Sequence, residues 1–158
     1  MKLKKTLLIS LFSFVLVGNV QATKNEHSPL LKGLSSEKKK EAVALLDAMD
    51  GLALFQNERY SEALPYLKSA ATYGDVTSQR LLGYLYLGQN GVKKDFHQAM
   101  KWFKKAAEQG DADAQFNLGV MYYKGNGVKQ NRQASIKWFD KSCNNGSQDA
   151  CEILSKLK

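Results

Sequence analysis

The feature that most constrains this chain is an internal repeat with a period of 36 residues. Gly74, Gly110 and Gly146 mark the period, and the segments between them match at many positions. Self-similarity at a period of roughly 20–50 residues is typical of proteins built from stacked structural units. The matched pairs are Gln79 and Gln115, Leu82 and Leu118, Gly83 and Gly119, Tyr86 and Tyr122, Gly91 and Gly127, Val92 and Val128, Lys101 and Lys137, Trp102 and Trp138, Phe103 and Phe139, and Lys105 and Lys141.

The first half of each unit is predicted to be a helix. Ala114, Leu118 and Tyr122 recur every four residues, which places them in one apolar helical stripe. Gly119 has no side chain, so a neighbouring helix can approach closely at this point. The glycines of the loop at 125–128 then end the helix, because glycine tolerates the left-handed backbone of a C-cap.

The second half of each unit is predicted to be another helix. It begins after Asp95 in one unit and after Asn131 in the next, and both residue types are favoured N-caps. Ala99, Trp102 and Phe103 fall on its buried stripe, while lysines lie on the outer face. Two helices in every unit predict an all-α fold, an α/α solenoid of stacked helix hairpins.

The N-terminus has the three parts of a secretory signal peptide. Three lysines precede an apolar run of eleven residues from Leu7 to Val17, and small residues lead to a cleavage site after Ala22. A membrane anchor is the alternative, but the run is well short of the roughly 20 residues that span a bilayer. We therefore expect export to a bacterial periplasm or secretion, with no integral membrane segment left after cleavage.

Shorter elements flank the two full repeats. The unit before them is shorter, since Gly51 matches Gly83 at a separation of 32 residues. The last residues begin one more first-type helix, which we expect to cover the end of the stack. The expected organisation is a signal peptide at 1–22, a flexible lead at 23–36, a short repeat at 37–74, full repeats at 75–110 and 111–146, and a capping helix at 147–158.

The positive charge of the chain is interpreted as a solvated surface. The sequence has 23 basic and 15 acidic residues and a formal charge of +8, which taken alone suggests an anionic partner such as nucleic acid. Cleavage after Ala22 would remove three lysines and no acid, leaving +5 on 136 residues. Much of this charge recurs on the outer faces of the repeated helices. In an oxidising compartment outside the cytoplasm, we expect no nucleic-acid partner.

The repeat resembles a known family. The pattern AxAQxxLGxxYxxGxGVxxDxxxAxxWFxxAAxxGD runs through residues 76–110 and 112–146, and more weakly through 37–74. It is similar to the Sel1-like repeat, a relative of the tetratricopeptide repeat, and the resemblance implies a right-handed superhelix of helix hairpins. Three departures leave that expectation unchanged: Gln89 at a loop glycine position, Asn131 in place of aspartate, and Ser142-Cys143 in place of an alanine pair.

The two cysteines are predicted to form a disulfide. Cys143 lies near the end of a second-type helix and Cys151 lies early in the next helix, and a tight hairpin can bring their Cα atoms within the roughly 7 Å that a bridge needs. Cysteine-rich secreted members of the Sel1-like family look similar, with two cysteines bridged across the turn. The alternative is two buried free thiols, which an oxidising compartment disfavours. A metal site is not expected, since neither His27 nor His97 is placed to help.

The sequence contains no arrangement of residues that indicates catalysis or a cofactor. Motifs of the GxSxG, HExxH, P-loop and GxGxxG types are absent. Asp111 and Asp113 lie close together, but we interpret them as the first turn of a helix, where their charges suit the helix dipole. We therefore expect a protein that is not an enzyme and takes no cofactor.

One face of the first-type helices is a candidate binding surface. At about 100° per residue, the side opposite the stripe at 114, 118 and 122 would carry three side chains in each unit. First-type helices line the concave surface in related repeat stacks, so these side chains would form a ladder across a groove. Packing between adjacent repeats is the alternative, and the sequence does not decide between the two. The candidate residues are Arg80, Tyr84, Leu87, Phe116, Val120, Tyr123, Leu52 and Phe55.

Two functions of different classes follow from these observations. The first is an exported, monomeric scaffold that binds a protein or peptide partner through this groove, in an adaptor, regulatory or immunity-type role, as the family resemblance implies. The second is a protein that binds or hydrolyses β-lactams or cell-wall fragments, as some cysteine-rich Sel1-like proteins do. A third possibility, adsorption to anionic membranes or wall polymers, would follow from the charge alone.

Overall fold

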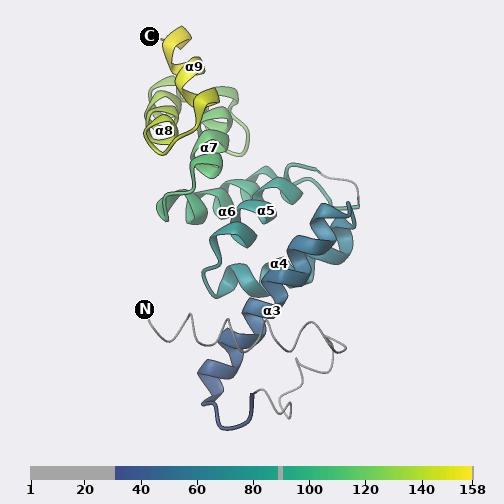
Figure 1. The fold of residues 1–158 in the computed structure, drawn as a ribbon. Coiled ribbons are helices and arrows are strands. Elements are labelled where there is room, and N and C mark those ends of the chain that lie inside the picture. The colour runs from purple at the N-terminus through teal and green to yellow at the C-terminus, as the bar shows by residue number, and fades with distance from the viewer. Residues whose placement is uncertain (1–30, 89–90, 158) are drawn as a thin grey trace. The chain divides into compact units, whose positions relative to one another are not determined.

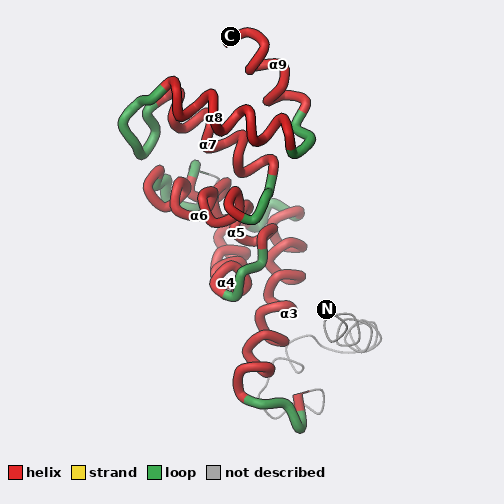
Figure 2. The backbone as a smooth tube through the Cα atoms, turned by 90° about the vertical axis from the view of Figure 1, so that its left-hand side faces the viewer, coloured by secondary structure: helices red, strands yellow, loops and turns green. Residues whose placement is uncertain are grey.

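The computed structural model describes residues 31–88 and 91–157. The expected signal peptide and residues 23–30 of the expected lead lie outside the described residues. Within the described part, every regular element is a helix and no strand is present, so the all-α prediction is confirmed there (Figure 2). The helices are α3 (Ser36–Gln56), α4 (Tyr60–Thr72), α5 (Val76–Tyr86), α6 (Phe96–Glu108), α7 (Ala112–Lys124), α8 (Arg132–Asn144) and α9 (Gln148–Leu157) (Figure 1).

The chain divides into two compact units, residues 1–46 and 47–158, and the division falls within α3. In the first unit, the structure describes residues 31–46. There Lys40 forms an exposed ion pair with Glu37, one turn earlier on α3, at 3.2 Å. The helix hairpins lie in the second unit, where α5 packs against α6, α7 against α8, and α9 against α8.

Short polar side chains begin the helices of the full repeats. Asp111 accepts a hydrogen bond from the backbone N–H of Ala114 at 2.8 Å, and Asn131 accepts one from Ala134 at 2.9 Å. Asp95 caps α6 in the same way. These contacts satisfy backbone donors that have no partner inside the helix, and they confirm the predicted helix starts. At the other end of α7, Gly125 has the left-handed conformation predicted for its C-cap, with φ of 75°.

Glycines allow the two helices of each hairpin to approach closely. A Cβ atom on Gly83 would lie 2.5 Å from the ring of Phe103, and one on Gly119 would lie 2.6 Å from the ring of Phe139. Real Cβ atoms do not come this close to other heavy atoms, so any larger residue would push the helices apart. The close approach predicted at Gly119 is therefore confirmed, and Gly51 makes the equivalent contact in the short unit, against Leu67.

Three apolar clusters form the core of the second unit. Leu67, Phe103 and Phe139 lie 36 residues apart, and each is almost fully buried at the centre of one cluster. Each cluster joins a second-type helix to the first-type helix that follows it. Stability is thus distributed along the stack, as expected for a protein in which each unit contacts only its neighbours.

Candidate functional site

A buried glutamine connects each first-type helix of the full repeats to the helices on either side. In α5, the side-chain N–H of Gln79 donates to the carbonyl oxygen of Ala71 at 3.1 Å. In α7, Gln115 donates in the same way to Ala107 at 3.0 Å, and its Oε1 accepts a hydrogen bond from Asn145 at 2.8 Å. One side chain therefore joins α6, α7 and the end of α8. Below we call this arrangement the glutamine clamp.

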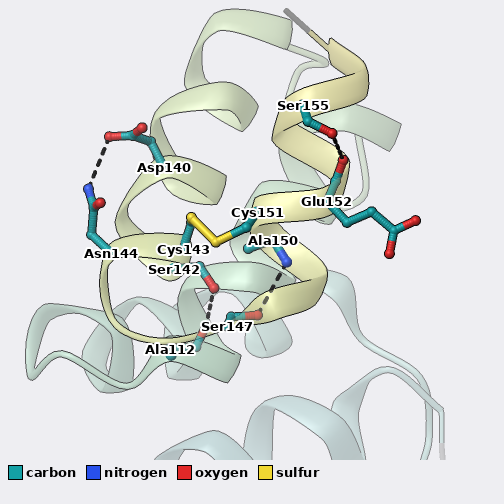
Figure 3. Close-up of a disulfide and its surroundings, with 10 residues drawn as sticks. All are labelled: Ala112, Asp140, Ser142, Cys143, Asn144, Ser147, Ala150, Cys151, Glu152 and Ser155. Atoms are coloured by element: carbon teal, nitrogen blue, oxygen red, sulfur yellow. Dashed lines mark hydrogen bonds between the residues drawn. A yellow bond between two sulfur atoms is a disulfide. The ribbon is translucent and has the colours of Figure 1, made fainter.

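The disulfide lies at the next position of the same series (Figure 3). A shift of 36 residues moves Ala107 and Gln115 onto Cys143 and Cys151, whose sulfur atoms are bonded and whose Cα atoms are 4.8 Å apart. A covalent bond between α8 and α9 thus takes the place of the hydrogen bond between α6 and α7. The predicted disulfide is confirmed, and the alternative of two free thiols is not what the structure contains.

Two serines hold the chain beside the disulfide (Figure 3). Ser142 stands where the preceding repeat has alanine and is fully buried, and its hydroxyl donates to the carbonyl oxygen of Ala112 at 2.7 Å. Because that hydrogen bond satisfies the hydroxyl, the polar substitution is tolerated in the core. Ser147 accepts from the backbone N–H of Ala150 at 3.3 Å, at the start of α9.

Where α5 approaches α7, an ion pair joins the two helices. The Arg80 guanidinium on α5 lies 3.1 Å from the Asp111 carboxylate and 3.5 Å from the Asp113 carboxylate. Both acids belong to the beginning of α7, which confirms their interpretation as a helix start. The arginine and Asp111 are largely buried, so solvent screens their pair less than an ordinary surface pair.

Tyr84 fills the space between α5, α6 and α7. Its ring lies edge-on to Phe103, with the centroids 5.3 Å apart, and its hydroxyl accepts a hydrogen bond from the Asn117 side chain at 3.0 Å. Burial raises the pKa of Tyr84, and the hydrogen bond from Asn117 opposes that rise. The aromatic ring and its polar end therefore both have partners, as buried tyrosines require.

The corresponding place between α7 and α9 contains apolar side chains instead. Under the 36-residue shift, Phe116 replaces Arg80, Val120 replaces Tyr84, and Ile153 replaces Asn117. Phe116 and Val120 pack against the cluster centred on Phe139. The ion pair and the hydrogen bond between α5 and α7 thus have no counterparts at Phe116, Val120 and Ile153.

An open groove of about 370 Å³ lies at this second place, among α7, α8 and α9. Tyr123, with 45% of its surface exposed, is the most exposed aromatic residue of the groove. Lys124 and Lys156 are exposed and bring two positive charges to it. We refer to this feature as the terminal groove. Its lining residues are Val120, Tyr123, Lys124, Phe139, Ile153, Lys156 and Leu157.

The eight predicted partner-binding residues do not form one continuous exposed ladder. Most are partly buried between adjacent helices, and among the eight only Tyr123 is exposed. Two of them, Val120 and Tyr123, line the terminal groove. Of the others, Leu52 and Phe55 pack against the cluster at α4 and α5, Arg80 and Tyr84 lie between α5 and α7, Leu87 packs against the cluster at α6 and α7, and Phe116 packs beside Phe139.

Sequence reasoning missed the other residues of the terminal groove. The signal that could have found them is a difference between two copies of the repeat. Tyr84 and Asn117 contact one another, whereas the residues at the equivalent positions, Val120 and Ile153, have neither a ring nor a polar group. The residues missed are Lys124, Phe139, Ile153, Lys156 and Leu157.

Lysines on the second-type helices cover the two tryptophans. The Lys105 ammonium lies 4.7 Å from the centroid of Trp102, and the Lys141 ammonium lies 4.6 Å from the centroid of Trp138. A cation above an aromatic face is attracted by the electrons of the ring. Part of the positive charge of the repeats therefore packs on side chains of this protein.

Neither a metal centre nor a membrane-spanning helix is found in the part of the chain that the structure describes. Across residues 31–88 and 91–157, no three histidine, cysteine, aspartate or glutamate side chains gather as a metal site would require. Over the same residues, no helix is both long enough and apolar enough to cross a bilayer.

The helix hairpins are similar to proteins of solved structure. A Sel1 repeat protein from Oxalobacter formigenes is 36% identical with a TM-score of 0.66, and the match covers 70% of this chain and 45% of that one. Helicobacter pylori cysteine rich protein B is 32% identical with a TM-score of 0.62, and the match covers 75% of this chain and 90% of that one.

A third structure shows the fold alone. It is c5321, a protective antigen present in uropathogenic Escherichia coli strains that displays an SLR fold. It is 24% identical with a TM-score of 0.71, and the match covers 95% of this chain and 36% of that one. This chain therefore spans less than half the length of the Oxalobacter and Escherichia proteins.

No curated protein matches this chain. The family model described as Sel1 repeat matches residues 76–111 and 112–147. In addition, a relative of 32% identity is matched over 90% of its length, and the glutamine clamps and close helix approaches recur every 36 residues. Because of these matches, this all-α solenoid belongs to the Sel1 repeat family.

Proposed function

We propose that this protein is an exported Sel1 repeat scaffold that binds a protein or peptide partner through the face of its first-type helices, with the terminal groove at the centre of the binding surface. The observation that carries the proposal is the groove itself: an apolar hollow with an exposed tyrosine and two exposed lysines. Aromatic side chains are enriched at protein interfaces, where they combine large contact area with a polar end.

The repeats offer support for binding rather than for catalysis. Their polar side chains form hydrogen bonds and ion pairs that join one helix hairpin to the next, as Gln115 and Arg80 do. The lining of the terminal groove is apolar apart from Tyr123, Lys124 and Lys156. A surface of this composition is suited to contact with another chain.

Export is the second part of the proposal. The sequence of residues 1–22 has the organisation of a signal peptide, and the Cys143–Cys151 bridge is compatible with an oxidising compartment. We infer that the protein acts in the periplasm or outside the cell.

A photo-cross-linking amino acid at position 123 tests the binding surface in living cells. The matched control is position 73, because Tyr73 is also an exposed tyrosine, at 47%, but lies at the end of α4 away from the terminal groove. We expect a specific adduct with another protein from position 123 and none from position 73. Equal labelling from both positions, or none from position 123, would contradict the proposal.

A further inference from the structure

We propose that the terminal groove is a socket for one aromatic side chain of a partner peptide, and that acidic residues beside that side chain pair with the lysines of the groove. This inference rests on the proposed function and specifies the chemistry of its partner. It is carried by the comparison of two equivalent places in the repeat and by the charges around one of them.

The first argument is that an aromatic ring already fills the equivalent place between α5 and α7. The Tyr84 ring lies there against Phe103, while Asn117 donates a hydrogen bond to its hydroxyl. Between α7 and α9, Phe139 is kept in the place of Phe103, but Val120 supplies no ring, and Phe139 meets the ring of Phe116 instead, with the centroids 5.5 Å apart. A short side chain thus replaces the tyrosine of the preceding repeat at the place where the terminal groove opens.

The walls of the terminal groove suit such a ring. Val120, Phe139 and Ile153 line it with aliphatic and aromatic carbon, against which an aromatic side chain can pack. The volume of about 370 Å³ is at the low end of the roughly 300–1,000 Å³ usual for ligand pockets. A single large side chain is thus a better fit than a drug-sized molecule.

The second argument is charge complementarity. Lys124 and Lys156 both line the groove and are exposed. Lys156 forms an ion pair of 2.6 Å with Glu152 on the same helix, where both side chains are highly exposed and readily exchange partners. Among the described residues, Lys124 forms no ion pair. A carboxylate beside the bound ring would therefore meet at least one available ammonium group.

A panel of three labelled peptides tests the socket directly. The first is a short glycine-serine peptide with a central Glu-Phe-Glu, the second has alanine in place of its phenylalanine, and the third has lysine in place of both glutamates. Fluorescence anisotropy with the purified full chain measures their binding. We expect the first to bind, and the other two to bind at least about 30-fold more weakly, the effect of losing one central interface residue.

The methyl group of Ile153 reports where the peptide binds. Isoleucine occurs at positions 9, 136 and 153, and of the two that the structure describes, 136 and 153, only Ile153 lines the groove. In a sample with labelled isoleucine methyl groups, the Glu-Phe-Glu peptide should shift the Ile153 signal and leave the Ile136 signal in place.

A variant that fills the groove from within provides the second test. Val120→Tyr combined with Ile153→Asn restores the tyrosine and the asparagine found between α5 and α7, and should reduce binding of the Glu-Phe-Glu peptide by about 30-fold. Lys124→Glu, an exposed substitution that leaves the core intact, should weaken binding of that peptide and favour the lysine-flanked one. This variant keeps the proposal testable even if the double variant fails to fold.

The outcomes separate the socket from the scaffold function. Equal binding of the phenylalanine and alanine peptides, or no binding of either, would overturn the socket. So would an unchanged cross-link from position 123 in the folded Val120→Tyr, Ile153→Asn variant, although the scaffold function would then stand. Conversely, specific peptide binding with no cellular cross-link from position 123 supports the socket and contradicts the scaffold function.

Discussion

Replacing the disulfide with the hydrogen bond found at the same place in the preceding repeats should recover part of the stability that the disulfide provides. Two variants differ at one position only. The first combines Cys143→Ala with Cys151→Ala and removes the bridge. The second combines Cys143→Ala with Cys151→Gln and restores the residues of the glutamine clamp, alanine and glutamine, at the same separation of 8 residues.

The magnitudes follow from the size of the loop and the strength of the hydrogen bond. A bridge that closes a loop of this length limits the unfolded chain and contributes about 2.5 kcal/mol in the chain-entropy treatment. A net contribution of about 1 kcal/mol is usual for one intramolecular hydrogen bond. The alanine variant should therefore lose about 2.5 kcal/mol at the junction of α8 and α9, and the glutamine variant should lose about 1.5 kcal/mol.

Hydrogen exchange on α9 is the assay that resolves this local effect. In a stack where units contact only their neighbours, α9 can open while the other helices stay folded. The backbone amide of Leu154 should exchange about 60-fold faster without the bridge, and about fivefold more slowly in the glutamine variant than in the alanine variant. The amide of Leu82, in the core of α5, is the control and should not change.

Two results would refute this reasoning. If the alanine variant exchanged the Leu154 amide at the wild-type rate, the bridge would not stabilise α9. If the glutamine variant exchanged this amide as fast as the alanine variant, a glutamine at position 151 would not stabilise α9 as the glutamine clamp is expected to do.

Three further predictions follow from contacts described above. Gly119→Ala should lower the free energy of unfolding by about 1–3 kcal/mol, measured by urea denaturation, because the new Cβ would meet Phe139 at 2.6 Å; unchanged stability would contradict the close packing. Burial raises the pKa of Tyr84, so its folded-state pKa exceeds the unfolded value of about 10. The contribution of this shift to the free energy of unfolding should be fully present below a pH of about 10 and be lost as the pH rises above it. In urea titrations from neutral to alkaline pH, the Tyr84→Phe variant should therefore lose less free energy of unfolding than the wild type. The purified protein should not hydrolyse the β-lactam nitrocefin in an absorbance assay. Hydrolysis by the wild type that a single point mutation abolishes would contradict a purely binding role.

Much of the fold could be predicted because it depends on local sequence. A period of 36 residues, a capping aspartate such as Asp111 and a glycine at a helix contact such as Gly119 each carry their meaning within one repeat. The disulfide could be predicted equally well, since Cys143 and Cys151 lie on either side of a short turn. Each of these features depends on residues that lie close together in the sequence.

The terminal groove could not be predicted in the same way. Helical angles place Tyr84 and Val120 on the same face, but they do not say which side chain fills the space beside the next helix. Tyr84 fills it and Val120 leaves it open, and that difference depends on the lengths of two side chains and on Phe139 and Ile153 across the interface. Binding and packing use the same face of the helix, so the face alone could not distinguish them.

The exchange of a glutamine for a disulfide bears on how this solenoid could be lengthened. Gln115 accepts a hydrogen bond from Asn145 at the end of α8, the second helix of its own hairpin, so each clamp also secures the helix that completes its unit. A cystine at 143 and 151 offers no side-chain amide for that purpose. A designer who wished to graft another 36-residue unit after α9 should therefore begin from Cys143→Ala with Cys151→Gln, which would supply the missing acceptor, and should keep the disulfide where a stable terminus is wanted.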